Sequence, residues 1–469
     1  MVSWWPGGGR RVVASCGLAL VVSLMTGAAH GSVWPSSHER VALALQSTDN
    51  AERRAAARQL GELPPEIGRP LARKALLDPD VEVRLSAARS AAILGVTGAG
   101  DIVVPWLSDL DRRLRVAACA LIEVSPTPRS VGALARVLGD ADSRVRRAAA
   151  AAMGRSGSAD VVAPWLGHLD DTVVAVRLEV VRALGRLGDV RSVVPLVSKL
   201  QDPEVEVRRA AARSLGSLGD PRAVPTLLLA LQDASSAVRI QALDALGRLG
   251  AEDGITAIAA LLNGREAGVG SGLILSERAR VGALEALGRI GSEQAVQILI
   301  SNLEREGGEV PPGWFDDPSR PPSRPAPVRR ALVLAGEPAV AALLSTLTST
   351  ASQSLASGAA LALAELHAAR ALPEIIRATQ RGTVSLDAAF KSFATLRDAR
   401  ALPFVLEHLD DPDARVRRMV VAVAVRLLDP QDADGRVVDP VRPRVLSLEV
   451  SVAERIGLIE LLGRSASAR

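Results

Sequence analysis

The apolar positions of this chain recur with a fixed period. An arginine recurs at a constant interval, in most copies directly after an apolar residue, and a further apolar residue usually follows seven positions later. The arginines in this register are Arg53, Arg84, Arg115, Arg146, Arg177, Arg208 and Arg239. An interval that stays constant over seven copies does not arise by chance. The pattern therefore indicates an array of structural repeats.

Each repeat is predicted to contain two helices. In the copy that begins at Asp202, Val207, the alanine four residues on and Leu215 follow the spacing of one helix face. We expect a longer helix from Asp202 to Gly216, then a Gly-Asp turn and a shorter helix within residues 220–231. One such hairpin cannot bury its apolar face alone, so neighbouring hairpins must stack into a solenoid.

The repeat has a recognisable signature. Aspartate, then Val-Arg, alanine, Leu-Gly and a Gly-Asp turn resemble HEAT repeats, and the short period with "LGSLGD" (residues 215–220) resembles the HEAT-like repeats of phycobilisome bilin lyases. The resemblance covers residues 40–464. It implies an all-α fold, a right-handed α-α superhelix of roughly 12 two-helix repeats, whose concave face is lined by the helix after the aspartate. It says little about function, because such repeats occur in scaffolds, adaptors and a few enzymes.

Composition and charge agree with a helical chain and exclude some functions. Of 469 residues, 48% are hydrophobic but 2% aromatic, so helix formers without rings must build the core. The net charge of +4 is a weak reason to expect nucleic acid. Cys119 is the one cysteine after the N-terminal leader, which leaves no disulfide framework.

The ends and two interruptions suggest the domain organisation. Arg10-Arg11, an apolar run and small residues are typical of a secretory signal, so we expect export to a bacterial periplasm or the outside of the cell. The alternative is a membrane anchor through residues 12–29. An insertion at residues 263–276 lengthens one repeat. The expected order is 1–31 signal peptide or anchor, 32–303 first solenoid segment, 304–328 Pro/Gly-rich linker, 329–428 degenerate second segment, 429–447 polar connector and 448–469 capping helix.

An aspartate stands six residues before most of the repeat arginines. We expect it at the N-cap of the longer helix, with proline, as in Asp202-Pro203, at the first helical position. The arginine is expected to reach the aspartate of an adjacent repeat; a catalytic pair would not be copied into consecutive units. This arginine–aspartate ladder comprises Asp78, Arg84, Asp109, Arg115, Asp140, Arg146, Asp171, Arg177, Asp202, Arg208, Asp233, Arg239, Asp411 and Arg417.

A second set of residues forms the candidate binding surface. Positions one, five and nine after the ladder arginine lie on one helix face and are rich in arginine, which suits carboxylate or phosphate recognition. The alternative is an ordinary solvated face. Two aromatic residues of the linker either dock on their own solenoid or anchor a partner. The candidates are Arg147, Arg155, Arg182, Arg186, Arg209, Arg213, Arg248, Trp314 and Phe315.

The sequence holds no nucleophile elbow, zinc-protease motif or phosphate-cradling loop, so no cofactor or metal is expected. We therefore expect a monomeric, non-catalytic scaffold or adaptor that binds a protein or peptide, an acidic one if the arginine face is functional. Membrane contact is expected only through an uncleaved anchor, and no nucleic acid is expected. The alternatives are an enzyme or enzyme subunit like the bilin lyases and a nucleic-acid-binding HEAT-like protein.

Overall fold

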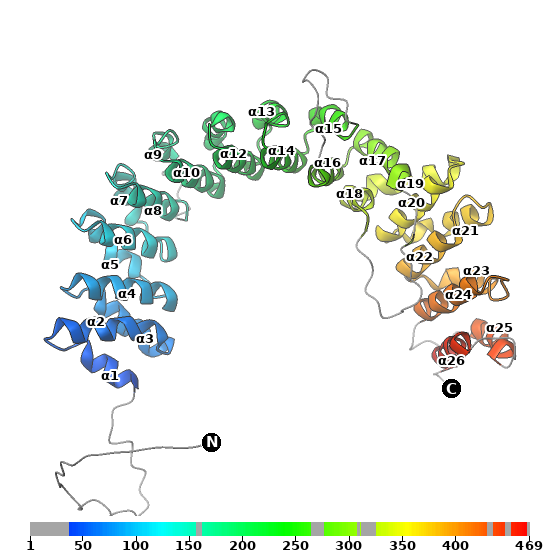
Figure 1. Ribbon diagram of the computed structural model, residues 1–469, viewed down its shortest axis with the longest axis horizontal. Coiled ribbons are helices and arrows are strands. Elements are labelled where there is room, and N and C mark those ends of the chain that lie inside the picture. The colour runs from blue at the N-terminus through cyan, green and yellow to red at the C-terminus, as the bar shows by residue number, and fades with distance from the viewer. Residues whose placement is uncertain are drawn as a thin grey trace, which may run out of the picture. The chain divides into compact units, whose positions relative to one another are not determined.

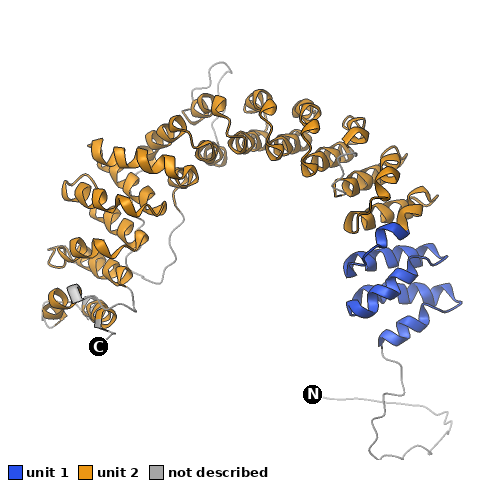
Figure 2. Ribbon diagram, turned by 180° about the vertical axis from the view of Figure 1, so that it is seen from behind, with its two compact units in different colours: residues 1–102 blue, residues 103–469 orange. Residues whose placement is uncertain are grey.

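The chain folds into helices throughout the part that can be described. The computed structural model describes residues 37–155, 162–263, 276–306, 310, 325–428, 435–445 and 452–466. In these residues it contains 26 α-helices and no strand, which confirms the all-α solenoid class (Figure 1). The chain divides into two compact units, residues 1–102 and residues 103–469 (Figure 2).

Unit 1 consists of helices that pack on their neighbours in sequence. Helix α4 packs against both α2 and α3, and its Ala87 and Ala91 are fully buried, one helical turn apart. The helices of this part of the chain are α1 (Ser37–Ala44), α2 (Asn50–Gln59), α3 (Pro65–Ala75), α4 (Val81–Leu94) and, at the boundary, α5 (Ala99–Val103).

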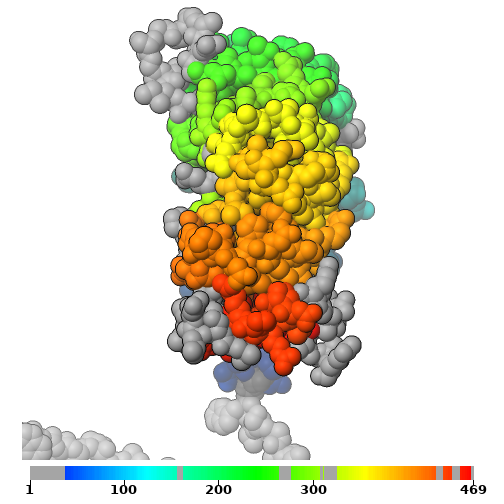
Figure 3. All heavy atoms as spheres, turned by 90° about the vertical axis from the view of Figure 1, so that its right-hand side faces the viewer, coloured from blue at the N-terminus to red at the C-terminus, as the bar shows by residue number. Residues whose placement is uncertain are grey.

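Unit 2 arranges its helices in two layers. The even-numbered helices from α6 to α26 form the first layer, in which each helix packs on the next, and the odd-numbered helices from α7 to α25 form the second layer. Figure 2 shows the first layer along the inner side of unit 2. Figure 3 shows the repeats of the C-terminal half stacked in chain order, from yellow to red.

The bounds of the helices follow the repeat. The first layer consists of α6 (Arg112–Val124), α8 (Ser143–Met153), α10 (Val174–Leu187), α12 (Val205–Leu218), α14 (Ser236–Arg248), α16 (Glu277–Ile290), α18 (Pro327–Ala335), α20 (Gln353–Glu365), α22 (Leu386–Leu396), α24 (Ala414–Leu427) and α26 (Val452–Ala466). The second layer consists of α7 (Ser130–Val137), α9 (Val162–Leu166), α11 (Val193–Ser198), α13 (Val224–Ala230), α15 (Ile255–Leu262), α17 (Glu293–Glu306), α19 (Glu337–Ser349), α21 (Leu372–Gln380), α23 (Leu402–Leu406) and α25 (Gly435–Val445).

The core lies between the two layers and between successive helices of each layer. In α12, Val207, Ala211 and Leu215 are fully buried, as the four-residue spacing predicted. Leu227 of α13, which packs against α14, is equally buried. Small and medium apolar side chains thus fill the space between closely packed helices, consistent with the shortage of aromatic residues.

The first-layer helices begin two residues later than we expected. The N-cap of α12 is Glu204, not Asp202, and Pro203 therefore precedes the helix. Asp202 instead accepts a hydrogen bond from the backbone N–H of Glu204, at 2.9 Å. The expected N-cap role of the ladder aspartates was wrong: their carboxylates close a turn in front of the helix, because they also have to receive an arginine from the preceding repeat.

The helices also continue past the glycine that was expected to end them. Gly216 lies inside α12, which ends at Leu218, and the left-handed residue is Gly219, with φ of 71°. A Cβ atom on Gly216 would lie 2.7 Å from the Cα of Ala245 in α14. Glycine is required there because two first-layer helices approach each other closely, not because the chain turns.

The C-terminal part also differs from the expectation. The expected polar connector, residues 429–447, contains helix α25, whose Val437 and Val441 are fully buried. The expectation of a polar connector was therefore wrong for residues 435–445. The two valines lie one turn apart and give α25 an apolar face that it buries against α26. Most of the expected linker, including Trp314 and Phe315, lies outside the described residues.

Candidate functional site

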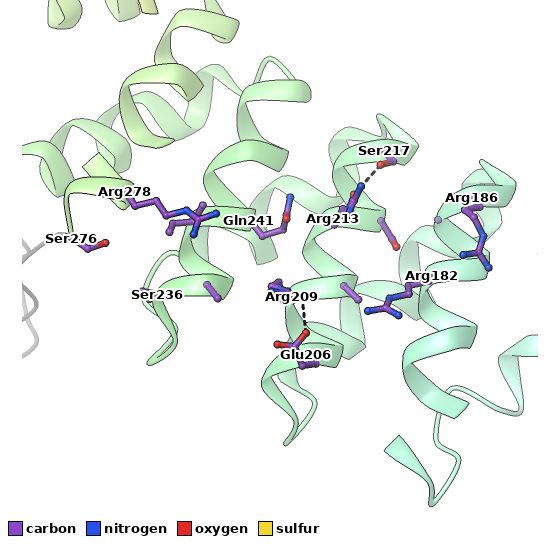
Figure 4. Close-up of a pocket in the computed structure, with 15 residues that line it drawn as sticks. Arg182, Arg186, Glu206, Arg209, Arg213, Ser217, Ser236, Gln241, Ser276 and Arg278 are labelled. Carbon is purple, nitrogen blue, oxygen red and sulfur yellow. Dashed lines mark hydrogen bonds and ion pairs between the residues drawn. The ribbon is translucent and has the colours of Figure 1, made fainter. Parts of the chain in front are cut away.

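A groove crosses the first layer of unit 2 over four successive helices, α10, α12, α14 and α16 (Figure 4). Its volume is about 880 Å³. Five arginines line it, together with four serines and one glutamine, whereas the lining contains one carboxylate, Glu206, and no aromatic side chain. The arginines are Arg182, Arg186, Arg209, Arg213 and Arg278. The groove is therefore rich in hydrogen-bond donors and positively charged.

The repeat register places these arginines. Arg182 of α10 and Arg213 of α12 occupy the same position in successive repeats, one full period apart. Arg209 lies one turn before Arg213, and both project from α12 between Arg182 and Arg186 on one side and Arg278 on the other (Figure 4). All five are exposed because they stand beside the buried apolar stripe of their helices.

Two of the groove arginines have acidic partners. Arg186 Nη2 lies 2.7 Å from Glu179 Oε1, and Arg209 Nη2 lies 2.7 Å from Glu206 Oε2. Each of the two arginine side chains remains 44% exposed in its pair, so the pairs are weak and a ligand can compete for the guanidinium groups. Arg182, Arg213 and Arg278 form no ion pair with any residue that the structure describes.

Some arginines of the predicted binding face are paired with acids. On α14, the position equivalent to Arg213 is Asp244, which pairs with Arg248 at 3.0 Å and with Arg289 at 2.8 Å. On the other side of the groove, Arg155 Nε lies 3.3 Å from Glu123 Oε1. Of the sequence candidates, Arg155 and Arg248 are thus balanced by neighbouring acids.

The remaining candidates lie elsewhere. Arg147 on α8 is exposed and forms no ion pair among the described residues, but it does not line the groove. Arg278 was missed in the sequence because it stands two residues before Arg280, where the register resumes, and not one, five or nine residues after the repeat arginine; Glu206 and Ala237 occupy the same position on α12 and α14 and also line the groove. The available signal was the helix start at Ser276, whose hydroxyl caps α16 and places Arg278 in its first turn.

The arginine–aspartate ladder is separate from the groove lining. In the ladder, an arginine pairs with the aspartate 25 residues later, at 2.7–2.9 Å. Unit 1 contains one such pair, Arg53 with Asp78. The pairs within unit 2 are Arg115 with Asp140, Arg146 with Asp171, Arg177 with Asp202, and Arg208 with Asp233. Arg208 Nη1 also donates to the carbonyl oxygen of Asp202, at 2.9 Å. Each such guanidinium joins consecutive hairpins, which is a structural role.

The ladder changes where the repeat does. Arg239 donates to the carbonyl oxygen of Asp233 at 2.7 Å, but the equivalent position in the next repeat is Gly264, so the sequence supplies no carboxylate there. Near the C-terminus, Arg417 Nη1 donates to the carbonyl oxygen of Asp411 at 2.9 Å. Arg239 thus keeps the hydrogen bond to the turn before its own helix, although no carboxylate stands at the ladder position of the next repeat.

Within the described ranges, no three His, Cys, Asp or Glu side chains gather in a way that could hold a metal ion. Cys119 is fully buried, and burial raises the pKa of its thiol to about 12. No helix of the described part is long and apolar enough to cross a membrane, and residues 12–29 lie outside that part.

Comparison with known families agrees with the repeat architecture. The family model for HEAT repeats matches residues 39–119, 100–185 and 193–270, and the model for the PBS lyase HEAT-like repeat matches residues 176–202 and 279–305. Together these matches cover more than half of the chain. The chain belongs to the HEAT-repeat proteins, which are helical repeat scaffolds for protein interactions.

Several solved structures align with the chain at low sequence identity, and the first of the three described next shows the same fold. Kap121p aligns at 14% identity with a TM-score of 0.50, over 92% of this chain and 48% of its own. YibA of Escherichia coli aligns at 18% identity with a TM-score of 0.39, over 62% of this chain and 98% of its own. The complex of CpcE and CpcF of phycocyanin lyase from Nostoc sp. PCC7120 aligns at 23% identity with a TM-score of 0.33, over 50% of this chain and 92% of that chain. No curated protein matches the sequence.

Proposed function

We propose that this protein is an exported, non-catalytic scaffold that binds an acidic partner protein through the groove across α10, α12, α14 and α16. The observation that carries the proposal is that Arg182, Arg213 and Arg278 line one groove and form no ion pair among the described residues. On the same layer, Arg248 is balanced by Asp244 of its own helix, and Arg147, which forms no ion pair among the described residues, lies outside the groove.

Arginine suits this role for two physical reasons. Its guanidinium stays charged at any physiological pH and presents a planar fork of donors that matches a carboxylate. Ser236 beside the arginines adds a hydroxyl donor and acceptor for a partner's backbone, and Ser217, which donates to the carbonyl oxygen of Arg213, keeps an acceptor oxygen. Because the arginines are exposed, we expect binding to weaken as salt is added.

The binding proposal is tested by site-specific photo-crosslinking in the producing cell. A crosslinker placed at Ser217, inside the groove, should capture a partner that one placed at Leu229, an exposed residue of α13 in the second layer, does not. The captured protein is then purified, and its affinity is measured for wild-type protein and for the double variant Arg182→Glu, Arg213→Glu. Equal affinity for both proteins would overturn the groove as the binding site.

Export is a separate part of the proposal and rests on the N-terminal sequence. Arg10-Arg11, the apolar run and the small residues before Ser32 are what a signal peptidase substrate requires. Fractionation followed by N-terminal sequencing should find a shortened chain outside the cytoplasm. A full-length chain that stays in the cytoplasm contradicts export, and a full-length chain in the membrane fraction supports the anchor through residues 12–29.

The absence of catalysis is also part of the proposal. A bilin-lyase-like activity would appear as an absorbance change when the purified protein is incubated with a tetrapyrrole and an acceptor protein. We expect no such change, and observing one would replace the scaffold proposal by an enzymatic one.

A further inference from the structure

The free charges in the groove are unevenly spaced, and the spacing bears on the form of the ligand. Going from α10 to α16, an unpaired arginine stands on α10 (Arg182), on α12 (Arg213) and on α16 (Arg278), as far as the described residues go. The lining residues of α14 are uncharged and include Ile240 and Gln241. The groove thus offers positive charge on its first, second and fourth helix and none on its third.

An extended chain fits this spacing better than a helix does. Successive packed helices lie about 8–10 Å apart, so the three steps from α10 to α16 span roughly 24–30 Å. A polyproline II segment advances about 9.3 Å in each turn of three residues, which matches one helix step. A bound amphipathic helix would need an apolar groove, whereas this lining consists mainly of arginine, serine and other small or polar residues.

A peptide also fits the groove better than nucleic acid does. Proteins that bind single strands stack the bases on aromatic side chains, and the lining contains no aromatic residue. A polyproline II backbone leaves its N–H and C=O groups free. The hydroxyl of Ser236 and the amide of Gln241 can pair with them, whereas the hydroxyls of Ser214, Ser217 and Ser276 already form hydrogen bonds within the protein.

From these observations, and resting on the proposed function, we infer that the groove binds an extended acidic peptide segment of about ten residues. The segment carries an acidic side chain at every third position, except at the position that faces α14. Two carboxylates meet Arg182 and Arg213, an uncharged side chain meets Ile240 and Gln241, and a third carboxylate meets Arg278. Arg182 and Arg213 stand at the same level of α10 and α12, whereas Arg278 lies in the first turn of α16, so the segment crosses the first two helices at one level and then runs obliquely toward the N-terminal end of α16.

The test compares two labelled ten-residue peptides of identical composition by fluorescence anisotropy with the full mature chain. The spaced peptide carries glutamate at positions 1, 4 and 10 and glutamine at position 7; the clustered peptide carries the three glutamates side by side. The spaced peptide should bind about tenfold more tightly, because it alone can engage all three free arginines. Equal affinities, or no saturable binding of either peptide, overturn the inference, as does a single-stranded oligonucleotide that binds more tightly than the spaced peptide.

Two variants connect the result to the groove. Arg278→Gln should remove most of the preference for the spaced peptide and leave the clustered peptide unaffected. Arg147→Gln removes the same charge from an exposed position of the same layer outside the groove, and it should change neither affinity. If neither peptide binds but the affinity of the crosslinked partner still depends on Arg182 and Arg213, the inference is overturned and the proposed function stands. If the affinity of the partner does not depend on those arginines, the proposed function is overturned.

Discussion

Arg208 and Asp233 join two consecutive repeats by a bidentate contact. Arg208 Nε lies 2.7 Å from Asp233 Oδ2, and Arg208 Nη2 lies 3.0 Å from Asp233 Oδ1. The third nitrogen, Nη1, donates to the carbonyl oxygen of Asp202, in the turn that precedes its own helix. The side chains of Arg208 and Asp233 are only 15% and 11% exposed, so this one arginine ties two turns of adjacent hairpins together in a largely buried position.

Replacing Arg208 by alanine should destabilise the fold and leave partner binding intact. The substitution leaves the mostly buried Asp233 carboxylate without its main partner, which should cost about 1–3 kcal/mol of unfolding free energy. Urea denaturation followed by circular dichroism measures the loss. Arg209→Ala, which alters the exposed neighbour, is the control and should change stability by less than about 0.5 kcal/mol. A variant of Arg208 that keeps wild-type stability but loses the partner would contradict the structural role.

Replacing Gly216 by alanine should also destabilise the protein, although alanine is the better helix former. The new Cβ would lie 2.7 Å from the Cα of Ala245, so two helices of the first layer have to move apart. We expect a net loss of about 1–3 kcal/mol, as for other overpacked sites. Gly132→Ala in α7 is the matched control, because a Cβ there meets nothing within 4 Å and should stabilise the helix slightly. Equal effects at the two glycines would argue against the close approach.

The ladder should make the protein sensitive to acid. The hydrogen bond from Arg146 holds the pKa of Asp171 below its usual range. Because the folded-state pKa is the lower one, this stabilisation is complete above the unfolded value of about 4 and is lost as the pH falls through the folded value. The urea midpoint should therefore stay level from neutral pH down to about pH 5 and drop below about pH 4. Asp171→Asn should flatten part of that drop; a midpoint that does not fall in acid would contradict the ladder's contribution.

Cys119 should report on opening of the fold. Its thiol is fully buried and has a pKa of about 12, so hardly any thiolate exists at neutral pH and reagents cannot reach it. In the chain that begins at Ser32, we expect no reaction with a thiol reagent at pH 8 in buffer and one thiol per chain in denaturant. Fast labelling without denaturant would show that α6 opens locally.

The repeat and its two helices could be predicted from the sequence because they depend on local information. The spacing of Val207, Ala211 and Leu215 selects a helix face, and the recurrence of the arginine shows that every hairpin meets the same neighbours. The helix limits were less accurate. Aspartate is a common N-cap residue and glycine a common residue at helix ends. In this fold, however, Asp202 receives Arg177 from the preceding repeat, and Gly216 allows the close approach of Ala245 in the next one.

The candidate site depended on the tertiary structure to a greater extent. The register alone indicates that Arg182 and Arg213 share a face, since they occupy one position in successive repeats. Which arginines stay free was decided by acids on the same and neighbouring helices: Asp244 pairs with Arg248 and with Arg289, whereas nothing in the described residues pairs with Arg182 or Arg213. Arg278 joins the groove from the position that Glu206 occupies on α12, because α16 resumes the register after the insertion and packs against α14. Local periodicity thus determined the repeat, and the packing of its helices decided where charge is left for a partner.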